Sequence, residues 1–169
     1  MKRIAILVED YYQVLEVWYP FLRLREEKME PVFVGTAIRE FKSKEGYPVK
    51  ADVAVKDAKV SDFDGVVIPG GWAPDILRRY PEVNGFVRDM HRQGKVVACI
   101  CHGGWVLVSA GILKGKKVTG FSAIKDDLVN AGAEFIDTEV VVDGNLVTSR
   151  NPYDLAAFCV QMIKQLKGV

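Results

Sequence analysis

The feature that most constrains this chain is an apolar, β-branched run at 96–100 that ends abruptly in two polar residues and two glycines. This pattern predicts a buried strand, a sharp turn at Cys101 and His102, and a helix after the turn. Small residues stand two positions before and two positions after Cys101, at Cys99 and Gly103, as the tight turn of a nucleophile elbow requires. A thiol at that turn lies at a helix N-terminus, where unpaired N–H groups favour the thiolate. The sequence therefore predicts a cysteine enzyme.

Strands and helices are expected to alternate along the chain. A continuously apolar strand, typical of a sheet covered on both faces, is expected at 3–8, and further strands are expected at 31–34, 64–68, 96–100 and 146–149. Helical patterns cover 14–28, 75–80, 82–93, the segment from the elbow to 110, 125–131, and the chain from Pro152 onward. This order predicts an α/β fold, a flavodoxin-like three-layer αβα sandwich with a mostly parallel sheet, and residues 1–169 as a single domain.

Shorter elements complete this prediction. Three short strands, expected to be antiparallel with a turn at Glu45 and Gly46, lie near 40–43, 47–49 and 51–55, and further strands are expected near 118 and 139–142. The first helix is expected to show an apolar face of Leu15, Trp18, Tyr19 and Leu22, and to be kinked or limited by Pro20. The last helix should begin at Pro152 with Asn151 as its cap, and bury a stripe of Leu155, Cys159, Met162 and Leu166.

Composition excludes several classes of function. A formal net charge of +1 over 169 residues gives no electrostatic reason to expect a nucleic acid or an anionic membrane as partner. No apolar run has the length of a membrane span, and no export signal is evident. With three cysteines, the chain is expected to carry reduced thiols in a cytoplasmic setting. Phosphate-binding and dinucleotide-binding glycine motifs and a zinc-ligand cluster are absent from the sequence, so neither cofactor nor metal is expected.

The carboxyl ends of parallel strands meet at one edge of a sheet, and three informative segments fall there: 9–16, 70–75 and 101–102. Gly70 and Gly71 either form a simple turn or offer backbone N–H groups to an oxyanion. Glu16, among apolar neighbours, is either a protonated carboxyl that donates to the thiolate or an ordinary first-turn glutamate.

The histidines and the remaining cysteines narrow the chemistry. His102 could move a proton for Cys101 or could bond the backbone at the start of a helix. His91 lies in a charged helix and is expected at the surface, whereas Cys99 and Cys159 are expected to pack in the core. No histidine follows His102, which argues against papain-type and glutaminase-type sites.

Four segments resemble one known family. They are EVWYP at 16–20, PGGWAPD at 69–75, ACICHG at 98–103 and SRNPYDL at 149–155. The chain resembles the PfpI-like intracellular protease branch of the ThiJ/PfpI superfamily, a class I glutamine amidotransferase-like group, over essentially its whole length. The resemblance implies a flavodoxin-like sandwich, and a cytoplasmic homo-oligomer that is built from dimers and often hexameric.

The same resemblance implies roles for individual residues. Cys101 matches the nucleophile, His102 the adjacent histidine, and Glu16 the buried glutamate that contacts the thiol. Asp75 matches an acid, often glutamate in this family, that reaches the histidine of a neighbouring subunit. The shorter side chain of Asp75 and the Gly104 that stands where many members have proline are departures from the family pattern.

Substrate binding is expected around the glycine turn. Gly70, Gly71 and the amide of His102 match the oxyanion-binding backbone of the family. Trp72 and Gly103 complete the expected substrate-binding set, and the indole of Trp72 is expected to narrow the site.

Three functions follow as hypotheses. The leading one is a cofactor-independent cysteine hydrolase, a PfpI-type intracellular peptidase. The second keeps the same residues and acts on α-oxoaldehydes such as methylglyoxal, as a glyoxalase III or a protein deglycase. A Trp-lined, narrow pocket would favour this second hypothesis. The third is a thiol-based sensor of oxidative stress, which requires an exposed thiol of low pKa.

Overall fold

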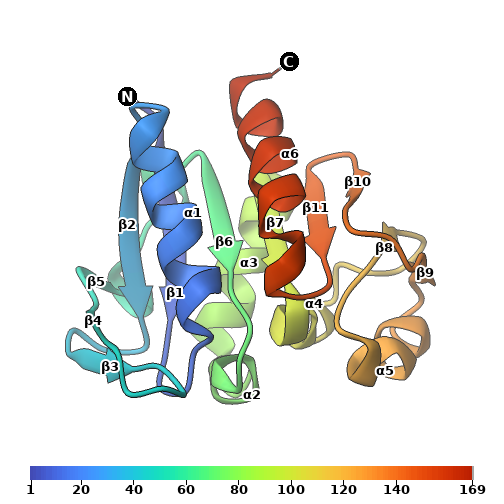
Figure 1. The fold of residues 1–169 in the computed structure, drawn as a ribbon, viewed down its shortest axis with the longest axis horizontal. Helices are drawn as coiled ribbons and strands as arrows, with labels where there is room; N and C mark the ends of the chain where they lie inside the picture. The colour runs from blue at the N-terminus through green and yellow to red at the C-terminus, as the bar shows by residue number, and fades with distance from the viewer. Residues whose placement is uncertain (169) are drawn as a thin grey trace.

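A seven-stranded sheet runs through the computed structural model, which describes residues 1–168, and helices cover both of its faces (Figure 1). Its strands lie in the order β10-β11-β7-β6-β1-β2-β5. Their bounds are β1 Arg3–Val8, β2 Glu30–Gly35, β5 Val53–Ala54, β6 Gly65–Ile68, β7 Val96–Ile100, β10 Val141–Asp143 and β11 Leu146–Ser149. All neighbours pair in parallel except β10, which is antiparallel to β11. The order β2-β1-β6-β7-β11 confirms the predicted flavodoxin-like fold.

The sheet lies between two layers of helices (Figure 1). Helices α1, Val14–Glu26, and α6, Leu155–Lys167, pack together on one face, and α3, Pro81–Arg92, and α4, Gly104–Ala110, pack together on the other. Two short helices, α2 Ala73–Leu77 and α5 Lys125–Asn130, follow β6 and the short strand β8, Lys117–Val118. Because both faces are covered, every residue of β6 and β7 is buried, which explains why these strands read as continuous apolar runs. None of the helices within 1–168 is long and apolar enough to cross a membrane.

Two small sheets lie outside the main one. The predicted hairpin is present as β3, Glu40–Lys42, paired antiparallel with β4, Pro48–Lys50. The third predicted short strand, β5, was wrongly expected to be antiparallel, because it pairs in parallel with β2 at the edge of the main sheet. A strand that the sequence did not predict, β9 at Glu134–Phe135, pairs in parallel with β8 at Lys117–Val118.

The buried face of α1 differs from the predicted one. Leu15, Tyr19 and Leu22 are exposed, whereas the helix buries Val17, Pro20, Leu24 and, at its first turn, Glu16. Trp18, the remaining residue of the predicted face, is partly buried and packs against the core together with Val14 and Phe21. Pro20 lies inside an α1 that continues to Glu26, so it neither ends nor limits the helix.

The last helix forms largely as predicted. The side chain of Asn151 accepts a hydrogen bond from the Tyr153 N–H at 3.0 Å, so Asn151 caps a single 3₁₀ turn at Pro152–Asp154 that leads into α6. The whole predicted stripe is buried, and it is joined by Phe158 and Ile163: Leu155, Cys159, Met162 and Leu166.

Replacing Phe158 by alanine should lower the free energy of unfolding by ~3–5 kcal/mol, because the fully buried ring leaves a cavity in the core. Val160→Ala on the exposed side of the same helix should change it by less than ~0.5 kcal/mol. Urea unfolding of the three proteins measures both values. Equal midpoints for the two variants would show that α6 does not form the core described here.

Candidate active site

Cys101 occupies a strained turn directly after β7. Its φ of 60° lies in the left-handed region, which a residue with a side chain adopts at a cost of ~1–3 kcal/mol. A Cβ at Gly103 would lie 2.6 Å from the Ile68 carbonyl oxygen and 3.0 Å from Cys99 Sγ, so only glycine fits there. The predicted nucleophile elbow is therefore present, with its small flanking residues required by close packing. Gly103 packs beneath the elbow and does not line the pocket above it, contrary to the expectation that it binds substrate.

Glu16 lies next to this turn, fully buried at the start of α1. Its Oε2 accepts the Gly70 N–H at 2.7 Å, and its Oε1 is buried without a hydrogen-bond partner within residues 1–168. Burial raises the pKa of the Glu16 carboxyl to about 7, against the lowering effect of the Gly70 N–H and the Cys101 thiol. The carboxyl can therefore take up or release a proton near neutral pH.

The Cys101 thiol does not have the low pKa that its position at a helix start predicts. Cys101 is only 6% exposed. Burial and the negative charge of Glu16 raise the pKa of the thiol to about 12, although the amides of His102 and Gly71 act in the opposite direction. Desolvation and the neighbouring carboxylate thus outweigh the helix terminus. The resting thiol is protonated, and Glu16, when ionised, is a group beside it that can accept its proton.

The glycine turn after β6 has two distinct tasks. The N–H of Gly70 is bonded to Glu16, so it is not free to bind an oxyanion, contrary to the expectation. A Cβ at Gly70 would come within 2.6 Å of Glu16 Oε2 and 2.9 Å of Cys101 Sγ, which shows how closely these two groups approach the backbone. The amides of Gly71 and His102 point at the sulfur and are the donors that remain for an oxyanion.

Gly71 itself requires glycine for a separate reason. Its φ is +79°, and a Cβ there would lie 2.4 Å from the Tyr11 carbonyl oxygen. The next residue, Trp72, is mostly exposed. Its backbone N–H donates to the Tyr11 carbonyl at 2.9 Å, and the centroid of its ring lies 6.1 Å from that of Tyr11. Trp72 therefore lies in the wall of the pocket above the thiol, and its contact with substrate stays a prediction.

His102 contacts the thiol directly. Its Nδ1 lies 3.3 Å from Cys101 Sγ, and its ring stacks on Phe121 with centroids 4.6 Å apart. Burial and the charge of Lys44 lower the pKa of His102, so its imidazole is neutral at neutral pH. Within residues 1–168 the ring has no carboxylate partner.

Asp75 does not reach His102 within one chain. It lies in α2, where its carboxylate is paired with Arg79 one turn later, and it is about half exposed. A role for Asp75 toward a histidine of another subunit stays a prediction.

A pocket of about 150 Å³ opens above the thiol, and we call it the inner pocket. Besides Gly71, Cys101 and His102, its lining residues are Gln13, Lys44, Trp72, Phe121 and Pro152. Sequence reasoning missed Lys44 and Phe121. Lys44 lies in the β3–β4 turn, and its N–H donates to the Tyr12 carbonyl at 3.0 Å. The position of that hairpin after the carboxyl end of β2 was a usable signal, because loops after parallel strands gather at one edge.

Other predicted residues lie away from this pocket. Cys99 and Cys159 are buried, as expected. His91 was expected at the surface, but it is partly buried in α3, its Nδ1 has no partner in the described part of the chain, and burial lowers its pKa. Within residues 1–168, no three histidine, cysteine or carboxylate side chains are grouped so that they could hold a metal ion.

Comparison with known proteins agrees with this geometry. Residues 2–165 match the model of the DJ-1/PfpI family. A deglycase of Thermococcus kodakarensis is 45% identical over 166 residues, covering 98% of this chain and 99% of the relative. The deglycase PfpI of Pyrococcus furiosus is 42% identical, and so is YraA of Bacillus subtilis, a protein provisionally named as a cysteine protease. Each alignment covers 98% of this chain and 99% of the relative.

Solved structures show the same fold. A two-domain protein of Anabaena variabilis, with DJ-1/ThiJ/PfpI-like and ferritin-like domains, superposes with a TM-score of 0.97 at 43% identity. The match covers 99% of this chain and 48% of that one, so this chain spans about half of the two-domain protein. DJ-1beta of Drosophila melanogaster superposes with a TM-score of 0.92 at 27% identity, covering 99% and 91% of the two chains.

Replacing Glu16 by glutamine should remove a pH dependence of stability. Because burial raises the pKa of Glu16 from 4.5 in the unfolded chain to about 7, the folded state binds more protons between these values. The free energy of unfolding of the wild type should therefore fall by ~3 kcal/mol as the pH rises from 4.5 to 8.

Urea unfolding at several pH values measures this difference. Glu16→Gln should lack this fall, whereas Glu26→Gln, an exposed position on the same helix, should keep it. Parallel stability profiles for the wild type and Glu16→Gln would show that Glu16 ionises normally.

Proposed function

Because the chain belongs to the DJ-1/PfpI family, we propose that it is a cysteine-dependent deglycase that acts on adducts of small α-oxoaldehydes. The observation that carries the proposal is the buried pair of Cys101 and Glu16 under a pocket of only about 150 Å³. Drug-sized ligands occupy pockets of ~300–1,000 Å³, so the inner pocket suits a reactive group of a few atoms. Relatives at 41–45% identity are named deglycases, which agrees with this substrate class.

The first step exchanges one bond at the former aldehyde carbon of the adduct. Glu16, ionised, takes the proton from the Cys101 thiol, and the sulfur bonds to the carbon that carries the amine. The carbon–nitrogen bond breaks, and the amine leaves with the proton that Glu16 held. The amides of Gly71 and His102 lie where they can stabilise negative charge on the oxygen of that carbon.

The second step is an internal oxidation and reduction. Glu16 removes the proton from the carbon bonded to sulfur, and the electron pair left behind forms an enediol across the two carbons. The proton is then returned to the adjacent carbon, while the hydroxyl proton of the first carbon passes to the oxygen of the second. The first carbon becomes a thioester and the second an alcohol, so no external oxidant or reductant is needed. Water then cleaves the thioester, which releases a 2-hydroxy acid and restores the thiol. A carboxyl with a pKa of about 7 is suited to both proton transfers.

Peptide hydrolysis is a second candidate, which the provisional name of the Bacillus subtilis relative favours. The same sulfur would attack a peptide carbonyl and the same two amides would bind the oxyanion. His102 would then move protons, oriented by Asp75 of a second copy in a homo-oligomer. The third hypothesis, a thiol sensor, loses its premise, because Cys101 is buried and the pKa of its thiol is raised.

Turnover of the methylglyoxal adduct of N-acetyl-lysine should depend on both members of the pair. Cys101→Ser should lower kcat/KM by ~10³-fold or more, and Glu16→Gln by ~10²–10⁴-fold. In the wild type, kcat/KM should rise with pH through about 7 as Glu16 loses its proton, and this limb should vanish in Glu16→Gln.

Cys159→Ala, which alters a buried thiol on α6, is the matched control and should keep full activity. The same proteins are assayed with a panel of fluorogenic peptides. Peptide cleavage that requires Cys101, without turnover of the adduct, would replace the proposal by the second candidate. Turnover of neither compound would refute both.

A further inference from the structure

A second and larger pocket adjoins the inner pocket. It has a volume of about 340 Å³, and we call it the outer pocket. The two pockets share Phe121, and the consecutive residues Asn151 and Pro152 line the outer and the inner pocket respectively. The Phe121 ring therefore borders both the outer pocket and the pocket above the Cys101 thiol.

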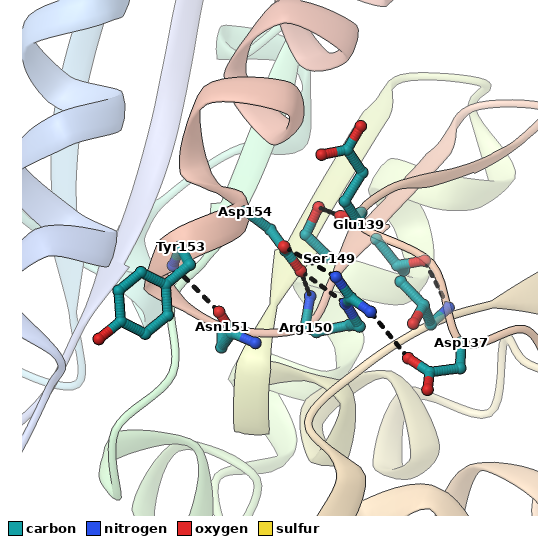
Figure 2. Close-up of polar contacts among 9 residues, drawn as sticks. Asp137, Glu139, Ser149, Arg150, Asn151, Tyr153 and Asp154 are labelled. Carbon is teal, nitrogen blue, oxygen red and sulfur yellow. Dashed lines mark hydrogen bonds and ion pairs between the residues drawn. The ribbon is translucent and has the colours of Figure 1, made fainter.

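The outer pocket presents a fixed guanidinium. Arg150 donates from Nε and Nη2 to the two carboxylate oxygens of Asp154, at 2.9 and 3.1 Å, as Figure 2 shows. The Asp154 side chain is only 6% exposed, so this two-point contact holds the guanidinium rigidly.

The opposite side of Arg150 has a weaker partner. Nη1 donates at 2.9 Å to Asp137, whose side chain is 79% exposed (Figure 2). An ion pair this exposed contributes ~0–1 kcal/mol, so a ligand carboxylate can take the place of Asp137. Asp137 thus marks a position where a carboxylate fits against Arg150.

Lys125 supplies a second cation to the same pocket. Its Nζ lies 5.7 Å from the centre of the Phe135 ring, and within residues 1–168 its ammonium group makes no ion pair or hydrogen bond. Ser122 and Asn151 add a hydroxyl and an amide to the lining. The wall of the outer pocket is therefore rich in donors.

The charges of the two pockets favour an anion. Among their lining residues, Lys44, Lys125 and Arg150 are cations and Asp137 is the single anion. Asp154 behind the pocket offsets the charge of Arg150, so the two lysines supply the excess positive charge. His102, in the wall of the inner pocket, adds no positive charge at neutral pH, because burial and Lys44 lower its pKa. A substrate with a negatively charged group several bonds from its carbonyl could place the carbonyl in the inner pocket and the charge in the outer pocket.

We propose that the outer pocket binds a carboxylate of the substrate through Lys125 and Arg150 while the adduct carbon reaches Cys101. The inference rests on the proposed function and narrows its substrates. The preferred class is then oxoaldehyde adducts of small amines and thiols that carry a free carboxylate, such as amino acids and the C-terminal residues of peptides. Adducts on side chains inside a protein chain lack that group and are poorer substrates.

Two matched substrates test the proposal: the methylglyoxal hemithioacetals of N-acetylcysteine and of N-acetylcysteinamide, which differ only in the carboxylate. The wild type should prefer the carboxylate compound by ~10-fold in kcat/KM, with the difference in KM, because the outer pocket acts on binding. Lys125→Met should reduce this ratio toward one, Lys125→Arg should preserve it, and Asp137→Asn should increase it by freeing Arg150.

Lys59→Met is the matched control, because Lys59 is an exposed lysine before the amino end of β6, at the opposite edge of the sheet. It should leave the ratio unchanged. Equal turnover of the two compounds by the wild type, still dependent on Cys101, would refute carboxylate binding in the outer pocket and leave the enzyme proposal intact.

Absence of turnover with both compounds would instead refute the enzyme proposal. Titration of the isotope-labelled protein with N-acetylglycine, followed by its amide NMR signals, then tests the pocket alone. Shifts at Phe121, Ser122 and Asn151 that are lost in Lys125→Met would support carboxylate binding. No shift at these positions would refute it.

Discussion

The contact on which the site depends is the one that joins Glu16, Gly70 and Cys101. These residues come from the start of α1, the end of β6 and the end of β7, so three segments far apart in the sequence meet at one point. A side chain at Gly70 would collide with both the carboxyl and the thiol. The parallel sheet makes this meeting possible, because it brings the carboxyl ends of β6, β1 and β7 to the same edge.

The contact between Glu16 and Cys101 lowers the stability of the fold but supplies the group that the proposed reaction needs. An ionised carboxyl that is fully buried beside a thiol is unfavourable, and the raised pKa values of both groups measure that penalty. The pair holds more protons at neutral pH than the same groups would hold in water. In return, the site has a carboxyl that titrates near neutral pH beside the Cys101 sulfur, which must lose its proton in the reaction. The left-handed turn at Cys101 adds backbone strain at the same place.

The sequence predicts most of the framework, because that framework follows from local rules. An apolar run ending in CHGG predicts the elbow. The apolar neighbours of Glu16 left two interpretations of its carboxyl open, and its burial beside Cys101 favours the one with a raised pKa. The predicted buried face of α1 was wrong at Leu15, Tyr19 and Leu22, which are apolar but exposed; only Trp18 of that face packs against the core. Which side of a helix meets the sheet depends on the chain before and after it, and a periodic pattern with two apolar faces does not contain that information.

The pocket around the thiol was the least predictable part, and the reason is physical. Lys44 and Phe121 follow secondary strands, β3 and β8, that are only two or three residues long and carry no periodicity of their own. They reach the site because the backbone around Tyr12 binds the β3–β4 turn and because Phe121 stacks on His102. Such contacts are long-range and set by packing. The turn that carries the nucleophile is thus encoded locally around Cys101, whereas Glu16 and Gly70 are brought to it by the parallel sheet. The residues that line the pocket come from loops at the same sheet edge, where loop sequence can vary without disturbing the core.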